Sequence, residues 1–247
     1  MELFEKTKGL GIVKALKRMD LYPFFRILEG SVGSQVVHAG HSVVMLSSNN
    51  YLGLTHDPRV QEAAIEAIRK WGTGCTGSRA LNGNLALHEE LEVRLAKFMG
   101  TEDAIVFASG FLANQGAISA LAGENDYIFS DEENHACIIE GCKLSGAKVM
   151  VYRHSDMAHL EQLLQQVPEK AGKLIITDGV FSMTGHLAHY DRIFELAQEY
   201  GARTYIDDAH GLGVIGRGGR GTASHFNLPA DITMGTFSKS FASQGGF

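Results

Sequence analysis

Proline, cysteine and tryptophan are scarce in this sequence, which has four, three and one of them among 247 residues. The cysteines, Cys75, Cys137 and Cys142, are odd in number and lack the spacing of metal ligands. A disulfide scaffold and a zinc site are therefore not expected, and no metal site is predicted. Free cysteines are typical of a reducing compartment, so we expect a cytoplasmic protein.

Long apolar runs and excess positive charge are also missing. No segment approaches the roughly 18 apolar residues of a membrane-spanning helix, and residues 1–18 mix charged with apolar side chains, unlike a secretory signal. Lys and Arg total 22 against 28 Asp and Glu, which gives a net charge of −6. This balance argues against nucleic acid as a partner, and the lack of a long apolar run argues against a transmembrane segment.

Glycine and apolar residues are plentiful, with 29 glycines and 45% apolar residues, enough for a sizeable core. After residue 100, short apolar stretches alternate with helical patterns of about ten residues. Such alternation predicts an α/β fold with a mostly parallel sheet between helices. Strands are expected at residues 104–108, 127–130, 148–152, 174–177, 204–207 and 232–234.

The part of the chain before residue 100 has a different pattern. Asp57-Pro58 and Gly72 bound one predicted helix, and Gly100 ends a second. Residues 1–47 are interpreted as an N-terminal arm with a small hairpin around Gly40-His41. Residues 48–247 are interpreted as one large domain, incomplete at its C-terminal end.

Four polar clusters follow predicted strands, where parallel sheets bind their ligands. Each cluster alone has an ordinary explanation: a common turn, a hydrogen-bonded loop histidine, a capping aspartate or an exposed lysine. The clusters are Ser109-Gly110-Phe111, Asn134-His135-Ala136, Asp207-Asp208-Ala209-His210 and Thr236-Phe237-Ser238-Lys239.

Taken together, the clusters match the needs of one ligand. The Gly110 turn offers backbone N–H groups to an anion. Asp207 can face a ligand nitrogen, and His135 can stack on an aromatic ring. Lys239, if desolvated, would be nucleophilic towards an aldehyde. An aldehyde with a phosphate and a pyridine ring requires this set of groups, which predicts pyridoxal 5′-phosphate (PLP).

Several longer motifs, in order along the chain, carry a resemblance. The sequence is similar to the α-oxoamine synthase family of fold-type I PLP enzymes. Within that family, residues 72–83 and 235–247 look most like bacterial serine palmitoyltransferases. The motifs are SNNYLGL (48–54), GTGCTGSRALNG (72–83), ASGFLAN (108–114), DEENHA (131–136), DGVFSM (178–183), DDAHGLG (207–213) and GTFSKSF (235–241).

The resemblance implies roles around the cofactor ring. Lys239 would bond covalently to the cofactor aldehyde, and Asp207 would pair with the ring nitrogen. His135 would stack on the ring and help to orient the substrate carboxylate. His210 and Ser182 would lie near the phenolic oxygen of the ring.

The resemblance also implies roles away from the ring. Gly110 and Phe111 would offer N–H groups to the phosphate, and Thr236 would add its hydroxyl. Asn49 would approach the substrate. The implied fold is the aspartate-aminotransferase-like large domain, with the C-terminal domain and its carboxylate-binding arginine absent. The Gly-rich residues 72–83 would reach towards a partner subunit, which implies a homodimer with active sites at its interface.

The implied activity is a decarboxylative condensation of an amino acid, L-serine, with a long-chain acyl-CoA thioester. The product would be a 3-keto amine of sphingolipid-type biosynthesis. Alternatives are an α-oxoamine synthase that uses glycine (of the glycine C-acetyltransferase, aminolevulinate synthase or aminooxononanoate synthase type), an aminotransferase, and a truncated non-catalytic partner subunit. Thr184, His186 and His189 depart from an acidic family segment, and Cys137 replaces a common serine.

Overall fold

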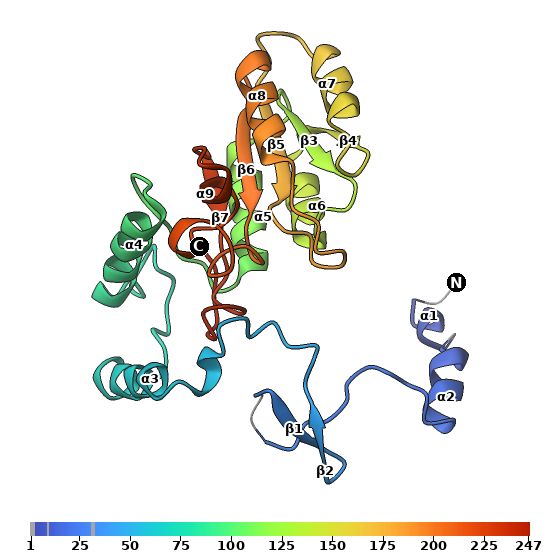
Figure 1. The fold of residues 1–247 in the computed structure, drawn as a ribbon, viewed down its shortest axis with the longest axis vertical. Helices are drawn as coiled ribbons and strands as arrows, with labels where there is room; N and C mark the ends of the chain where they lie inside the picture. Colours follow the sequence, from blue (N-terminus) through green and yellow to red (C-terminus); the bar gives the residue numbers. More distant parts are fainter. Residues whose placement is uncertain (1–2, 9, 31–32) are drawn as a thin grey trace. The chain divides into compact units, whose positions relative to one another are not determined.

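The computed structural model describes residues 3–8, 10–30 and 33–247. The chain divides into two compact units, Met1–Ser48 and Asn49–Phe247 (Figure 1). The predicted arm of residues 1–47 includes residues 1, 2, 9, 31 and 32, which lie outside the described residues. No helix within the described ranges combines the length and the apolar character that crossing a membrane requires.

The described residues of the first unit form two short helices and a hairpin. The helices are α1 (Glu5–Lys8) and α2 (Gly11–Arg18), and β1 (Gln35–His38) pairs antiparallel with β2 (His41–Val44). The turn residues Ala39 and Gly40 both have positive φ, 50° and 76°, as a two-residue turn between twisted antiparallel strands requires. The predicted hairpin is therefore confirmed.

The second unit begins with a short 3₁₀ helix, η1 (Leu54–His56), and two longer helices, α3 (Pro58–Trp71) and α4 (Ala86–Met99). The Asp57 side chain accepts the N–H of Arg59 and caps α3, as predicted. Gly72 and Gly100 follow the two helices with positive φ, 79° and 77°, so both predicted ends are confirmed.

A five-stranded parallel sheet forms the centre of the second unit, in the order β4-β3-β5-β6-β7 (Figure 1). Helices connect its strands, as the predicted α/β pattern requires. The strands are β3 (Tyr127–Asp131), β4 (Lys148–Tyr152), β5 (Lys173–Asp178), β6 (Arg203–Asp207) and β7 (Ile232–Met234). The remaining helices are α5 (Gly110–Leu121), α6 (Ala136–Ser145), α7 (Met157–Gln165), α8 (Tyr190–Tyr200), η2 (Arg217–Gly219) and α9 (Thr222–Phe226).

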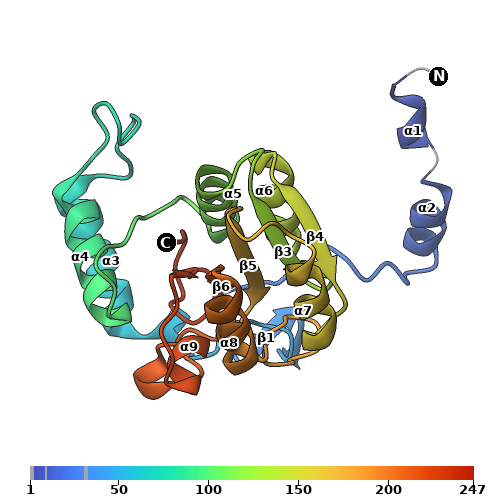
Figure 2. The same ribbon diagram turned by 90° about the horizontal axis from the view of Figure 1, so that it is seen from above.

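Helices cover both faces of this sheet: α5 and α6 lie on one face and α7 and α8 on the other (Figure 2). Successive strand residues point into two different cores. Ile128 and Ile176 pack in the core of the α5–α6 face. Their neighbours Phe129 and Ile175 pack in the core of the α7–α8 face. Burial on both faces explains why these strands have nearly continuous apolar sequences.

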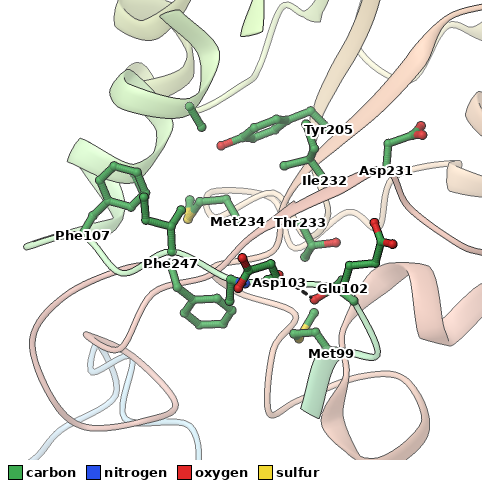
Figure 3. A pocket seen from close by; sticks show the side chains of 15 residues that line it. Met99, Glu102, Asp103, Phe107, Tyr205, Asp231, Ile232, Thr233, Met234 and Phe247 are labelled. Atoms are coloured by element: carbon green, nitrogen blue, oxygen red, sulfur yellow. Dashed lines mark hydrogen bonds between the residues drawn. The ribbon is translucent and has the colours of Figure 1, made fainter. Parts of the chain in front are cut away.

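The predicted strand at residues 104–108 is wrong. Only Phe107 pairs there, in an isolated antiparallel bridge with Gly246, and Ile105 is 60% exposed. A strand needs a hydrogen-bonding partner along its length, and apolar sequence alone does not supply one. A cavity of about 340 Å³ separates this segment from β7, and Figure 3 shows Phe107, Ile232 and Phe247 around it. None of the predicted site residues lines this cavity.

The contact between α5 and the sheet predicts a stability difference between two positions on one helix. Ile118 is fully buried, whereas Leu121 is 52% exposed. We expect Ile118→Ala to lower the free energy of unfolding by about 2–5 kcal/mol, and Leu121→Ala to lower it by less than about 1 kcal/mol. Urea denaturation followed by circular dichroism measures both, and equal losses would contradict the described core.

Candidate active site

All eight predicted cofactor-binding residues line one cavity of about 220 Å³. It lies at the carboxyl ends of β5 and β6, where the strands end at Asp178 and Asp207. The eight residues come from five separate segments of the chain. They are Gly110, Phe111, His135, Ser182, Asp207, His210, Thr236 and Lys239.

One end of the cavity is the first turn of α5. Ser109 Oγ accepts the N–H of Leu112 at 3.1 Å and caps the helix. The N–H groups of Gly110 and Phe111 have no intrahelical partner because they belong to the first turn. These groups and the helix dipole favour an anion here.

Glycine packing holds this turn in place. A Cβ atom on Gly246 would lie 2.6 Å from the backbone N and Cα of Gly110, so only glycine allows this approach. Thr236 Oγ1, predicted to serve the phosphate, donates to the carbonyl of Gly245 at 3.0 Å and lies 2.9 Å from Ser238 Oγ. Both hydroxyls line the cavity beside the helix turn.

Asp207, at the end of β6, is a buried carboxylate with its own donors. Asn114 Nδ2 donates to its Oδ2 at 2.6 Å, and the N–H of Ala209 donates to its Oδ1 at 3.1 Å. Tyr205 Oη donates to Asn114 Oδ1 at 2.8 Å and fixes the amide. Burial raises the pKa of Asp207, whereas these donors and the charge of Lys239 oppose that shift.

His135 caps α6 and is fixed through its backbone and its ring. Its N–H donates to Asp178 Oδ2 at 2.8 Å. Its Nδ1 accepts the N–H of Cys137 at 3.2 Å and lies 2.7 Å from Cys137 Sγ. Because Nδ1 acts as an acceptor, the proton of the neutral ring sits on Nε2.

Lys239 lies in the loop after β7 and lines the cavity. Its amine has no hydrogen-bond or ion-pair partner among residues 3–8, 10–30 and 33–247. Ser182, from the loop after β5, lines the same cavity. A lysine without a protein partner in a half-buried cavity is available to an electrophilic ligand.

His210 is held by a tyrosine that the sequence reasoning missed. Tyr51 Oη lies 2.6 Å from His210 Nδ1 and donates to Asn49 Oδ1 at 3.2 Å. Asn49, predicted to bind substrate, does not line the cavity and is linked to it through Tyr51. Burial, followed by the charges of Lys239 and His135, lowers the pKa of His210 to about 4.

Four residues of this network had no role assigned from sequence: Tyr51, Asn114, Asp178 and Tyr205. Tyr51, Asn114 and Asp178 stand inside the motifs NNYLGL, ASGFLAN and DGVFSM. A polar residue directly after the apolar start of α5, residues 110–113, is the signal that could have identified Asn114.

Two of the residues that depart from the family pattern, His186 and Cys137, differ in their position relative to the cavity. His186 Nδ1 is 3.0 Å from His154 Nε2, and His154 Nδ1 is 2.9 Å from Asp131 Oδ1. None of these three residues lines the cavity. Cys137, in contrast, is a lining residue.

Within the described ranges, no group of three or more His, Cys, Asp or Glu side chains is arranged to hold a metal ion.

The lowered pKa of His210 predicts a titration that can be measured. The imidazole should stay neutral down to a pH of about 4, and stability should rise with pH between that value and the unfolded-state pKa near 6.5. Removing the nearby charge in Lys239→Ala should raise the pKa of His210. Histidine NMR titrations, assigned with His210→Gln, measure the pKa of His210 in the wild type and in Lys239→Ala. An unchanged midpoint in Lys239→Ala would contradict the described proximity of Lys239 to His210.

Comparisons with known proteins agree with this geometry. Residues 41–247 match the family "Aminotransferase class I and II". The serine palmitoyltransferase of Bacteriovorax stolpii is 52% identical over 246 residues, covering 98% of this chain and 59% of that protein. The 8-amino-7-oxononanoate synthase of Thermoanaerobacter pseudethanolicus is 50% identical over 238 residues, covering 95% and 60%.

A solved structure extends the similarity to the fold. The serine palmitoyltransferase of S. paucimobilis, with PLP and myriocin bound, superposes with a TM-score of 0.94 at 37% identity. The match covers 100% of this chain and 63% of that one, so the chain spans about 60% of the length of its relatives. The chain belongs to the aminotransferase class I and II family, within its α-oxoamine synthase group.

Proposed function

We propose that this chain binds PLP and serves the condensation of L-serine with a long-chain acyl-CoA, with loss of carbon dioxide. One observation carries the proposal: Lys239, Asp207 and His135, from three distant segments, line a single cavity beside the start of α5. The relatives named serine palmitoyltransferase support the same reaction type.

The residues of the cavity fit the cofactor at each of its polar groups. The N–H groups of Gly110 and Phe111 would hold the phosphate, with the hydroxyls of Thr236 and Ser238 alongside. Asp207 would face the ring nitrogen, and the amine of Lys239, which has no partner among the described residues, would meet the aldehyde. The ring of His135 would pack on the cofactor face, its orientation fixed by the Cys137 amide.

When bound, PLP supplies an aldehyde that bonds to amines and a ring that accepts electrons from the adjacent carbon. The chain contributes proton control around that chemistry. Asp207, as a carboxylate, keeps the ring nitrogen protonated. Lys239, as a neutral amine, would take the proton from the Cα of the amino acid. His135 would orient the substrate carboxylate, with its ring proton on Nε2.

The choice of amino acid and acyl group is the finer part of the proposal. The serine assignment follows the serine palmitoyltransferase relatives at 49–52% identity. Relatives named 8-amino-7-oxononanoate synthase at 48–50% identity support a second candidate, another α-oxoamine synthase activity. Sphingolipid-type biosynthesis would be the context of the first candidate.

We further propose a cytoplasmic homodimer with active sites at the subunit interface. The helix α3 supports a second copy as partner, since it buries none of its own residues within the chain. Its apolar side chains Ile65 and Ile68 are 41% and 55% exposed. An apolar helix face of this kind is expected to be covered in an assembly.

The first test of the proposal is cofactor attachment. After incubation with PLP and desalting, the protein should keep a visible absorbance band that Lys239→Ala lacks, because only the lysine forms the covalent link. Lys143→Ala, an exposed lysine on α6, is the matched control and should keep the band. Equal bands in all three proteins would refute covalent attachment at Lys239.

Asp207→Asn tests the role of the carboxylate. The amide cannot stabilise a protonated ring nitrogen, so we expect the condensation rate to fall by about 10²–10³-fold, the scale of a lost preorganised electrostatic contact. Release of free CoA from the acyl-CoA thioester measures the rate. Asp191→Asn, on the exposed side of α8, should leave the rate unchanged. An Asp207→Asn protein with the wild-type rate would refute the proposed role of Asp207 in proton control.

A substrate panel separates the two candidate functions. L-serine, glycine and L-alanine, each with acyl-CoAs of graded chain length, are compared by CoA release. We expect serine with a long acyl chain to give the highest kcat/KM. A preference for another amino acid, or for short acyl chains, would favour the second candidate.

A further inference from the structure

Three neighbouring strands of the sheet each end in a buried aspartate. Asp131 ends β3, Asp178 ends β5 and Asp207 ends β6, with exposures of 3%, 5% and 3%. Asp178 is the register partner of Asp207 across the parallel pair, and both line the cavity. Buried carboxylates this close cannot all be ionised unless hydrogen-bond donors or cations compensate each of them.

The donors are distributed unequally among the three carboxyl groups. Asp131 accepts from the N–H groups of Glu133 and Ser155 and contacts His154 Nδ1. Asp207 accepts from Asn114 Nδ2 and the Ala209 N–H, with the Cys137 thiol at 3.8 Å.

Asp178 has the smallest set of donors. The only hydrogen bond that its carboxyl group accepts from a described residue comes from the N–H of His135, at 2.8 Å. The proton that relieves the crowding of charge therefore belongs on Asp178, because the other two carboxylates are better solvated by the protein.

We propose that Asp178 is a positioning residue that carries a proton, which leaves Asp207 as the sole anion of the pair in the cavity. The Oδ2 atom of Asp178 meanwhile holds the backbone amide of His135. The proposal rests on the proposed function only for the identity of the ligand that Asp207 faces. It assigns a role to a carboxyl group that the predicted chemistry of Lys239, Asp207 and His135 does not use.

The charged groups around Asp178 support this assignment. Burial and the charge of Asp207, with a smaller part from Asp131, raise the pKa of Asp178 to about 8, whereas the His135 amide and Lys239 act in the opposite direction. His210 and His135 line the same cavity, and His210 is neutral above a pH of about 4. Burial raises the pKa of Asp207 as well, but the donors Asn114 and the Ala209 N–H oppose that shift. The proposal therefore assigns the proton to Asp178 and the charge to Asp207 at neutral pH.

A neutral Asp178 matters for Lys239. An ionised Asp178 would give the lysine a second counter-ion and would favour its ammonium form, which is not nucleophilic. It would also give the ring nitrogen of the ligand a second anion in competition with Asp207. Keeping the proton on Asp178 therefore reserves one anion for one nitrogen.

The same carboxyl group fixes the entrance to α6. Asn134 Oδ1 accepts the N–H of Asp178 at 2.9 Å. Asp178 Oδ2 in turn accepts the N–H of His135, the residue that follows Asn134. This reciprocal pair joins the end of β5 to the start of α6. The position of the His135 ring in the cavity thus depends on an oxygen of Asp178 rather than on its charge.

Asp178→Asn separates the proton from the oxygen, because the amide keeps the size and the acceptor but cannot titrate. The direct readout is the infrared carbonyl band of a protonated carboxylic acid, recorded on the cofactor-free protein across pH. Buried Asp208 has a pKa raised to about 6 and also gives such a band at lower pH, so the comparison is made at pH 7 and above. There we expect a wild-type band that disappears with a midpoint near pH 8 and is missing in Asp178→Asn. In the matched variant Asp207→Asn the band should remain, with its midpoint moved to lower pH.

A second readout uses thermal unfolding. A carboxyl group with a raised pKa binds its proton in the folded state, so stability falls as pH rises from the unfolded-state value towards 8. The Tm of the wild type should therefore fall over this range relative to that of Asp178→Asn, which shares every other titrating group, His210 included. Asp178→Asn should have a higher Tm than wild type at pH 8, and the difference should vanish near pH 4.

Each alternative result has a defined meaning. A band that persists at pH 7 in Asp178→Asn, or is lost at that pH only in Asp207→Asn, places the proton elsewhere and overturns the proposal. If Asp178→Asn does not fold, a wild-type protein without the band at pH 7 overturns it equally. These measurements need no cofactor, so failure of PLP to bind would refute the proposed function and leave this inference to be decided separately. With PLP bound, the alkaline limb of the pH–rate profile near 8 should be absent in Asp178→Asn.

Discussion

The hydrogen bond from Asn114 to Asp207 is the interaction on which the site depends. A carboxylate buried at the end of a central strand is costly unless the protein supplies donors to it. Asn114 supplies one at 2.6 Å and is itself fixed by Tyr205. Asn114 lies one turn after Gly110 on α5, so one helix provides both the amides at one end of the cavity and the support for the anion at the other.

Close backbone packing keeps these two ends in register. The segment after β7 returns along the start of α5, where Gly246 approaches Gly110 and bridges to Phe107 and Thr236. The same segment carries Lys239. The spacing between lysine, helix turn and strand end is therefore set by contacts that tolerate no side chain, which explains the paired glycines 245 and 246 better than loop flexibility does.

The sequence predicted the sheet and the cavity residues well because both follow from local patterns. Apolar stretches bounded by capping residues define β3 to β7, and polar motifs directly after strands must gather at one sheet edge. The pairs that support the site could not be predicted in this way: Tyr205 and Asn114 are 91 residues apart, and Tyr51 and His210 are 159 apart. The prediction of a strand at residues 104–108 is wrong for a related reason, because an apolar pattern does not reveal whether a partner strand exists.

The cysteine at position 137 is best understood through the charge of the cavity. Burial and the neighbouring Asp207 raise the pKa of its thiol to about 12, so Cys137 stays neutral at physiological pH. A thiolate there would add a negative charge beside Asp207, which the few donors present could not compensate. A neutral side chain that contacts both Asn114 Nδ2 and His135 Nδ1 avoids this charge. A serine hydroxyl at this position would be neutral too, so either side chain has the property that the buried carboxylates require.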